Sequence, residues 1–153
     1  MEKILVAVDN GPASEKVALA CLKLGQKLNA EIALVSVVDT RLLMAEGGMT
    51  AGEMSDIIKN DFRRNQKNLI DKVFKGYKIW TFLEDGKPSE MILKVADKWQ
   101  ADLIVIGTHG RTGLANLLMG SVAEKVVRNS TRQVYVVPTT RYEKTFAQSV
   151  ILQ

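Results

Sequence analysis

Five apolar runs recur along the chain, and each has the composition of a β-strand. They span residues 4–8, 31–38, 77–83, 103–106 and 134–137. Four of the runs consist almost wholly of aliphatic residues, as do strands of parallel sheets that are covered on both faces. The run 77–83 is instead rich in aromatic and β-branched residues, which are also typical of strands. The pattern predicts five strands.

Between these runs, apolar residues recur at steps of three and four, the spacing that keeps one face of a helix toward a core. The first helix is predicted to have Ser14 as its N-cap residue and to end at Asn29 or Ala30. Its apolar stripe includes Cys21, for which we expect the role of a small core side chain. The other helical patterns span residues 54–73, 89–99 and 122–127.

Alternation of five strands with four helices predicts an α/β fold, because right-handed crossovers place helices on both faces of a mostly parallel sheet. A chain of 153 residues has the usual size of one domain. We therefore expect a single-domain open sheet of five mostly parallel strands, Rossmann-like in layout, over residues 1–138. Residues 139–153 are a C-terminal tail, for which fraying and docking on a partner subunit are the alternatives.

The strand and helix patterns are both lost between Thr40 and Gly52. Gly47 and Gly48 lie in this connection together with Met44 and Met49. A connection of this length in a compact domain often closes over a ligand. A lid and a disordered segment are the two alternatives that the composition leaves open.

Charge and cysteine content narrow the function classes. The chain has 21 Lys and Arg against 17 Asp and Glu, a formal net charge of +4, and the basic residues are scattered. Aromatic residues make up 6% of the chain and are not interleaved with basic ones, so nucleic acid is not favoured as a partner. A single cysteine cannot form an intramolecular disulfide, and no apolar run approaches the roughly 20 residues that span a bilayer. We expect a cytoplasmic protein without a membrane segment.

The most informative motif follows the fourth apolar run. Gly107, Gly110 and the pair Gly120–Ser121 form a G-x2-G-x9-G-S array between this strand and the helix that opens near Val122. Glycines at such a place let bare backbone N–H groups converge on one point, and the first amides of a helix are unpaired donors. The array therefore favours a polyphosphate ligand. Tight turns at the glycines and an ordinary helix cap at Ser121 are the simpler alternative.

Acidic residues end the first two predicted strands. Asp9 and Asp39 directly follow the first and second apolar runs. Ligands of open parallel sheets bind beyond the carboxyl ends of the strands, where the strand order reverses. Asp9, Asp39 and Gly107 are therefore predicted to line one crevice. Asp9 has a second interpretation, because a short carboxylate often caps a turn such as Asn10–Gly11.

Two further side chains lie beside the array. His109 is the sole histidine, but no serine or cysteine is placed as its nucleophile by a known elbow motif, so we expect a loop surface residue and assign no catalytic residue. Arg111 has two equal alternatives, screening of a γ-phosphate and simple solvation. The sequence also lacks a Walker A lysine next to Ser121 and a convincing aspartate pair for a metal. Any Mg²⁺ would be held chiefly by the phosphates of the nucleotide.

These segments resemble the universal stress protein family over nearly the whole chain up to Pro138. The resemblance is carried by residues 4–9, 37–39, 86–90, 101–113 and 120–124, with the sequences ILVAVD, VVD, GKPSE, ADLIVIGTHGRTG and GSVAE. It implies a Rossmann-like fold of the adenine-nucleotide α-hydrolase type. It also implies ATP as the cofactor, because the members that bind ATP are similar to this chain in keeping small residues at the glycine array.

The resemblance further assigns residues to the two ends of the nucleotide. Ala7, Val8 and Asp9 would lie at the adenosine end, where Asp9 accepts hydrogen bonds, and Val37 would offer backbone groups to the adenine. The ribose and phosphates would be held by the array and the helix that follows it: Gly107, Gly110, Gly120, Ser121 and Val122. Arg111 is a further candidate at the phosphates from its place in the sequence, with the two alternatives given above.

The function that the resemblance implies is that of an ATP-binding regulatory protein of the cytoplasmic stress response, in which an unidentified protein partner detects a nucleotide-linked change in shape. The alternative is a dimeric stress-response protein of the same fold that binds no nucleotide. An enzyme of the related hydrolase group would need catalytic residues that we do not find, so at most slow ATP hydrolysis is expected. Residues 134–137 are predicted to be an edge strand. In the family this edge pairs with its twin, so a homodimer is expected.

Overall fold

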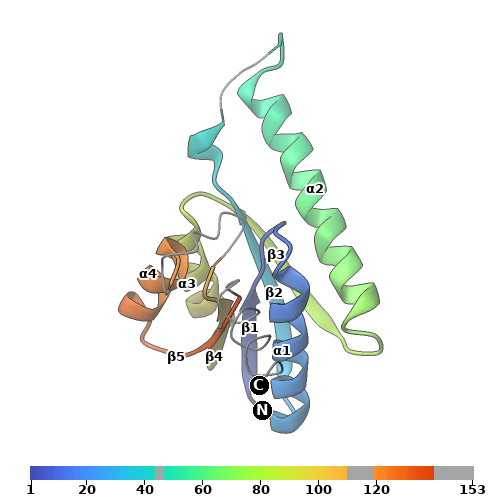
Figure 1. The fold of residues 1–153 in the computed structure, drawn as a ribbon, viewed down its shortest axis with the longest axis vertical. Coiled ribbons are helices and arrows are strands. Elements are labelled where there is room, and N and C mark those ends of the chain that lie inside the picture. The colour runs from blue at the N-terminus through green and yellow to red at the C-terminus, as the bar shows by residue number, and fades with distance from the viewer. Residues whose placement is uncertain (44–46, 110–118, 140–153) are drawn as a thin grey trace, which may run out of the picture.

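The computed structural model describes residues 1–43, 47–109 and 119–139. Within them five strands form one sheet in which every neighbouring pair is parallel, in the order β3-β2-β1-β4-β5 (Figure 1). The strands are β1 (Lys3–Ala7), β2 (Glu31–Val38), β3 (Ile79–Asp85), β4 (Leu103–Gly107) and β5 (Gln133–Val137). The helices are α1 (Ser14–Leu28), α2 (Ala51–Lys72), α3 (Pro88–Trp99) and α4 (Ser121–Asn129), with a short 3₁₀ helix, η1, at Thr40–Leu42. The predicted fold class is confirmed.

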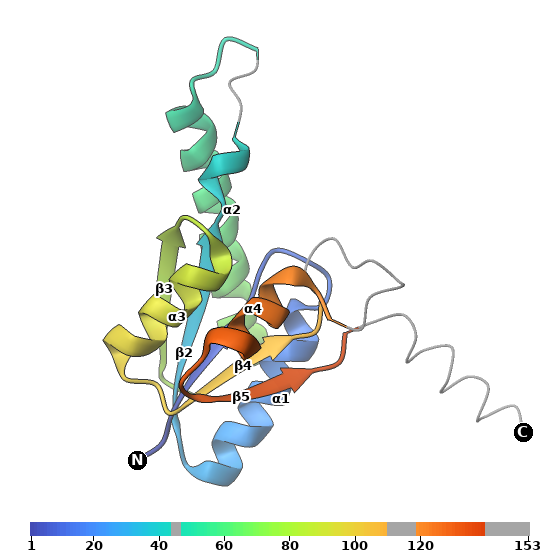
Figure 2. The same cartoon turned by 90° about the vertical axis from the view of Figure 1, so that its left-hand side faces the viewer.

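Hydrophobic cores lie on both faces of the sheet, because successive strand residues point to opposite faces. Ile4 and Val6 of β1 pack on one side with apolar residues of α1 and with residues at the end of α2. Leu5 of β1 packs on the other side with Ile92 of α3 and Val126 of α4. Figure 2 shows the same layering, with α3 and α4 in front of the sheet and α1 behind it. Strand β1 is therefore enclosed from both faces.

The bounds of the third strand differ from the prediction. Strand β3 covers Ile79–Asp85 instead of residues 77–83, whereas β2 has the predicted bounds. Tyr77 lies before the strand, and its hydroxyl donates to the carbonyl of Ala30 at 3.0 Å. Ala30 is the residue that precedes β2. The strand also continues beyond the apolar run through Glu84 and Asp85. Local composition placed the strand correctly but not its ends.

Helix α1 begins at Ser14, but Ser14 is not its N-cap residue as predicted. The N-cap residue is Ala13, whose side chain makes no capping hydrogen bond. The buried hydroxyl of Ser14 donates instead to the backbone carbonyl of Asp9 and lies 2.9 Å from that of Gly11. At the other end Asn29 adopts the left-handed conformation, with φ of 51°, and ends the helix as predicted. The β1–α1 turn is thus tied together from within.

The segment predicted to be irregular is shorter in the structure. Residues 40–42 form η1, and α2 begins at Ala51, so Gly52 is helical. Thr50 and Glu53 form a capping box: the Glu53 N–H donates to the Thr50 hydroxyl at 3.1 Å, and the Thr50 N–H donates to the Glu53 carboxylate at 2.9 Å. The start of α2 extends beyond the sheet, at the top of Figure 1. Residues 44–46 lie outside the described ranges, so lid and disorder both stay predictions.

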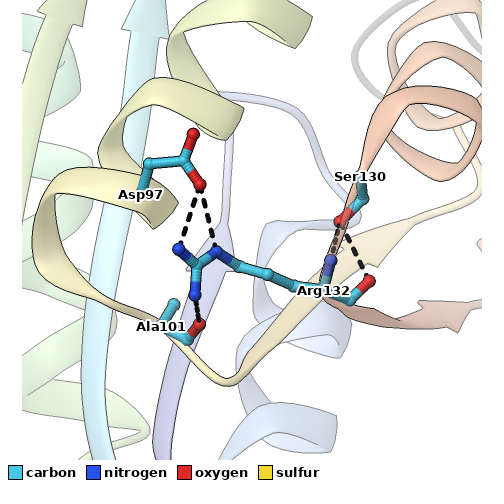
Figure 3. A network of polar contacts seen from close by, with 4 residues as sticks. All are labelled: Asp97, Ala101, Ser130 and Arg132. Carbon is cyan, nitrogen blue, oxygen red and sulfur yellow. Dashed lines mark hydrogen bonds and ion pairs between the residues drawn. The ribbon is translucent and has the colours of Figure 1, made fainter.

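Arg132 ties the end of α3 to the turn before β5 (Figure 3). Its Nη2 donates to Asp97 Oδ1 at 3.0 Å, and its Nη1 donates to the carbonyl of Ala101. Its own backbone is held by Ser130, whose hydroxyl accepts from the Arg132 N–H at 3.0 Å and donates to the Arg132 carbonyl at 2.9 Å. Because Ser130 ends α4, this network fixes the orientation of α4 relative to α3.

Several smaller predictions concern single side chains. Cys21 is fully buried in the core, as predicted, and burial raises the pKa of its thiol to about 12. Trp99 packs edge-on against Phe82 with ring centroids 6.4 Å apart, so it is a packing residue between α3 and β3. Among the helices described, we find none that combines the length and the apolar character needed to cross a lipid bilayer.

Candidate functional site

A cavity of about 430 Å³ opens at the carboxyl ends of β1, β2 and β4. The chain runs outward from β1 to β2 and β3 and then crosses back to β4 on the other side of β1. The cavity therefore lies where the strand order reverses, the usual ligand position in open α/β sheets. Its volume is within the range of small-molecule sites. Asp9, Asp39 and Gly107 all line it, so the predicted crevice is confirmed.

Most of the residues that the sequence assigned to a ligand surround this cavity. They are Ala7, Val8, Asp9, Val37, Gly107, Gly120, Ser121 and Val122. Gly110 and Arg111 lie outside the described residues, and their assignment stays a prediction. The sequence did not assign the apolar side chains of Val17, Val35 and Ile92, which also line the cavity. They make part of its wall suitable for a flat apolar group.

The start of α4 brings backbone donors to the cavity. Its first three residues, Ser121, Val122 and Ala123, line the cavity. N–H groups in the first turn of a helix have no carbonyl partner within the helix, and no described side chain caps α4 at its N-cap residue Gly120. The helix dipole adds roughly half a positive charge at this end. The arrangement can bind an anion.

Gly107 and Gly120, the two glycines of the array that the structure describes, are required by close packing of neighbouring atoms more than by space for a ligand. A Cβ atom at Gly120 would lie 3.1 Å from the backbone oxygen of Thr108, and one at Gly107 would lie 3.0 Å from methyl carbons of Val17 and Thr139. The Gly120 N–H donates to the same Thr108 oxygen at 2.6 Å. The Gly120 N–H thus closes the loop, and the donors offered to a ligand belong to the first turn of α4.

Side chains hold the turn after β1. Asp9 Oδ1 accepts a hydrogen bond from the Gly11 N–H at 2.8 Å, so the turn-capping interpretation holds beside the lining role. The Asp9 carbonyl accepts from the Ser14 hydroxyl and from Asn65 Nδ2, the latter at 2.8 Å. Asn65 belongs to α2, so this helix contacts the rim of the cavity. Helical periodicity identifies apolar faces only, which is why the sequence did not single out Asn65.

Asp39 forms a two-point ion pair at the rim. Arg41 donates from Nε to Oδ1 at 2.8 Å and from Nη2 to Oδ2 at 2.7 Å. These hydrogen bonds from Arg41 hold the pKa of the Asp39 carboxyl below its usual value. Asp39 therefore stays ionised at neutral pH. Two acidic side chains, Asp9 and Asp39, thus lie on the β1–β2 side of the cavity, where Arg41 balances the charge of Asp39.

His109 is buried, whereas the sequence predicted a surface position. Its side chain lines the cavity, and the residue is 6% exposed. Its backbone N–H donates to the Thr139 hydroxyl at 3.0 Å, and its ring Nδ1 lies 3.3 Å from Thr108 Oγ1. Within the described part of the chain, ring Nε2 has no hydrogen-bond partner. Thr139, beyond β5, holds the backbone of His109, so no local pattern around residue 109 reveals its burial.

Thr108 and Thr139 also belong to the site, although the sequence patterns do not single them out. Each hydroxyl residue follows the end of a strand, and β4 and β5 are neighbours with Gly107 opposite Val137. The parallel register alone therefore brings the two threonines together. Their Oγ1 atoms lie 3.1 Å apart. Hydroxyl residues just after two adjacent strands are the signal that identifies such a pair.

Known proteins are similar to this chain over nearly its full length. One relative, the universal stress protein MJ0531 of Methanocaldococcus jannaschii, is 33% identical over 147 residues, which cover 93% of this chain and 85% of the relative. The solved structure of the protein MJ0577 from the same organism has a TM-score of 0.80 at 28% identity, covering 92% of this chain and 97% of its own.

A third similarity concerns the fold alone. The structure of the universal stress protein from Archaeoglobus fulgidus in complex with dAMP has a TM-score of 0.64 at 22% identity, covering 89% of this chain and 97% of its own. The model of the universal stress protein family matches residues 1–138, which contain all the strands and helices described above and the cavity between them. The chain belongs to the universal stress protein family.

Proposed function

We propose that this protein binds ATP and acts as a nucleotide-dependent regulator in the stress response. The observation that carries the proposal is the cavity at the strand-order reversal, with apolar side chains in its wall and the uncapped first turn of α4 at its edge. An adenine nucleotide has the matching two-part chemistry, a flat apolar base and a charged phosphate chain. The dAMP complex of the Archaeoglobus fulgidus relative supports an adenine nucleotide as the ligand class.

The charges around the cavity favour one orientation of the nucleotide. A triphosphate at the β1–β2 side would face the Asp9 carboxylate and Asp39, whose charge Arg41 balances, and would find no helix N-terminus of the α4 kind at the end of β2. At the β4 side it would meet the amides and the dipole of α4. The adenosine would therefore lie toward Ala7, Val8, Asp9 and Val37, and the phosphates toward Gly107, Gly120, Ser121 and Val122. The family resemblance adds Gly110 to the phosphate end, and the sequence adds Arg111 as a candidate partner of the γ-phosphate.

The proposed activity is binding with at most slow hydrolysis. In the described ranges no group of three or more His, Cys, Asp or Glu side chains is arranged to hold a metal ion. Mg²⁺ would therefore be coordinated chiefly by the phosphate oxygens and water. The protein would then respond to whether ATP is bound, and a partner protein would detect the difference in shape.

A homodimer through β5 is part of the proposal. Strand β5 is an edge of the described sheet, and its Tyr135 side chain is 47% exposed. Edge strands with apolar side chains are usually covered in native proteins. Pairing of two copies along residues 133–137 would satisfy the exposed backbone groups. The Thr108 N–H donates a hydrogen bond to the Val137 carbonyl at 2.9 Å. Because Thr108 lines the cavity, this hydrogen bond connects the edge strand to the cavity.

Calorimetric titration with ATP and with adenosine tests the proposal. The variant Ser121→Asp places a negative charge at the first residue of α4, which favours the helix but repels a phosphate. We expect its Kd for ATP to rise about thirtyfold, while its Kd for adenosine stays within about twofold of wild type. Ser121→Asn is the neutral control of similar shape and is expected to retain ATP binding.

A negative result is equally clear. The wild-type protein would release no adenine nucleotide on denaturation, as measured by mass spectrometry, and would give no binding heat with millimolar ATP. The nucleotide proposal would then be wrong, and the alternative, a dimeric stress-response protein of the same fold without a nucleotide, would take its place.

A further inference from the structure

Thr139 holds the backbone of His109 from both sides. Its hydroxyl accepts a hydrogen bond from the His109 N–H at 3.0 Å and donates one to the His109 carbonyl at 3.0 Å. Thr139 follows β5, whereas His109 follows β4, so a single side chain joins two segments 30 residues apart. Because one hydroxyl binds both the N–H and the C=O of His109, the backbone of this residue cannot rotate without breaking a hydrogen bond. The start of the loop after β4 is therefore held in place.

Thr108 extends the connection to the start of α4. The Thr139 N–H donates to Thr108 Oγ1 at 2.9 Å, and the backbone oxygen of Thr108 accepts from the Gly120 N–H at 2.6 Å. Gly120 is the N-cap residue of α4. A continuous path of hydrogen bonds therefore runs from Thr139 through Thr108 to the first turn of the helix whose amides line the cavity.

The proton positions in this network can be assigned from the contacts. The Thr139 proton goes to the His109 carbonyl. The 3.1 Å contact between the two threonine oxygens then needs the Thr108 proton, which makes Thr139 Oγ1 a double acceptor. Thr108 Oγ1 in turn accepts from the Thr139 N–H and from His109 Nδ1, 3.3 Å away. Both hydroxyls are fully satisfied in this arrangement, so each part of the network supports the others.

Packing leaves little space for Thr139 to move. Its methyl carbon Cγ2 lies 3.0 Å from the position that a Cβ of Gly107 would occupy. The absence of a side chain at Gly107 thus allows the Thr139 methyl group to approach the end of β4. Gly107, which the sequence assigns to the phosphate site, thus also leaves space for Thr139.

We propose that Thr139 is a positioning residue, which ties the loop after β4 to the end of β5 and so holds the first amides of α4 where they meet the phosphates. This inference rests on the proposed nucleotide function. Thr139 itself is not among the residues that line the cavity. It therefore acts through Thr108 and His109, and its effect is specific to the phosphate part of the ligand, because the adenosine end is built from β1 and β2.

The variant Thr139→Val keeps the shape of the side chain and removes the hydroxyl, and Thr139→Ser restores the hydroxyl. We expect Thr139→Val to weaken ATP binding about tenfold and adenosine binding by less than about twofold, as measured by calorimetry well below the melting temperature. Thr139→Ser is expected to bind ATP within about threefold of wild type. Equal loss of ATP and adenosine affinity, or unchanged affinity for both, would overturn the positioning role.

Amide hydrogen exchange without any ligand tests the mechanical part independently. In Thr139→Val the amide protons of His109 and Gly120 are expected to exchange about tenfold faster than in Thr139→Ser, while amides of β1 and β2 stay unchanged. Unchanged exchange at His109 would overturn the inference, whatever the nucleotide titrations give. Failure of wild type to bind ATP would instead overturn the proposed function, and faster exchange in Thr139→Val would then still show that Thr139 holds the loop.

Discussion

The two strand–turn–helix units that border the cavity differ in how their polar groups are used. In the β1–α1 unit, side chains satisfy the turn: Asp9 accepts from Gly11, and Ser14 and Asn65 donate to Asp9. In the β4–α4 unit, the helix starts at Gly120 without a side-chain cap. Helix α1 also starts without a side-chain cap, at Ala13, so the two units differ in charge: the Asp9 carboxylate lines the β1–α1 side, here called the complete side, whereas no described carboxylate lines the β4–α4 side, here called the open side. This difference favours α4 as the phosphate end of the proposed site.

The largest expected loss of ligand affinity comes from filling the part of the cavity on the complete side, the β1–α1 unit. Ala7 lines the cavity at the end of β1, and Ala7→Met would place a long side chain where the adenosine is proposed to lie. We expect both ATP and adenosine affinity to fall about a hundredfold, in contrast to Ser121→Asp, which affects ATP alone. Ala7→Ser, which adds little volume, is the control. Calorimetry that showed adenosine binding unchanged in Ala7→Met would reverse the proposed orientation.

The next effect concerns the open side. In Gly120→Ala the new Cβ would lie 3.1 Å from the backbone oxygen of Thr108, which cannot rotate away. We expect a loss of about 1–3 kcal/mol in the free energy of unfolding, measured by urea denaturation, together with weaker ATP binding. Gly52→Ala is the matched control in α2, where a Cβ meets nothing closer than 3.8 Å. It is expected to stabilise by up to about 1 kcal/mol. Equal stabilities of the two variants would contradict the packing role of Gly120.

A smaller effect is expected at the contact between α2 and the complete side. Asn65→Ala removes the hydrogen bond to the Asp9 carbonyl and should lower the free energy of unfolding by about 1 kcal/mol. Asn60→Ala, on the exposed face of the same helix, should change it by less than about 0.5 kcal/mol. Because the bond holds a turn and not the phosphate side, ATP affinity is expected to stay within about threefold. A larger loss of ATP than of adenosine affinity would show that both units hold phosphate.

The smallest effect concerns the core beneath the cavity. Burial raises the pKa of the Cys21 thiol to about 12, so the folded protein should not react with a thiol reagent at pH 8, whereas the urea-unfolded chain should react fully. The thiol ionises in the unfolded state from its ordinary pKa of 9.0, before it does so in the folded state. Its contribution to stability is therefore complete below pH 9.0 and is lost as the pH rises toward 12. Rapid labelling of the native protein would show that this core opens readily.

The sequence predicted the cavity better than the details of its polar contacts. Apolar runs located the strands, and the rule for carboxyl ends then brought Asp9, Asp39 and Gly107 together correctly. These inferences depend on periodicity and topology, which short segments determine. His109 was placed wrongly because Thr139, whose hydroxyl binds its backbone, becomes its neighbour only after folding. Ser14 was placed wrongly because its hydroxyl binds the Asp9 carbonyl five residues earlier, a local choice of partner that helical periodicity does not reveal.

The central place of β1 has a consequence for the synthesis of the chain. Strand β1, which is synthesised before the other four strands of this sheet, pairs on one side with β2, but on the other side with β4, where Leu5 lies opposite Ile104. Half of its backbone partners are therefore translated about a hundred residues later, and contacts between such distant segments form slowly. Until then the nascent chain exposes an aliphatic strand edge. A growing polypeptide of this fold should need protection by a chaperone until β4 has emerged.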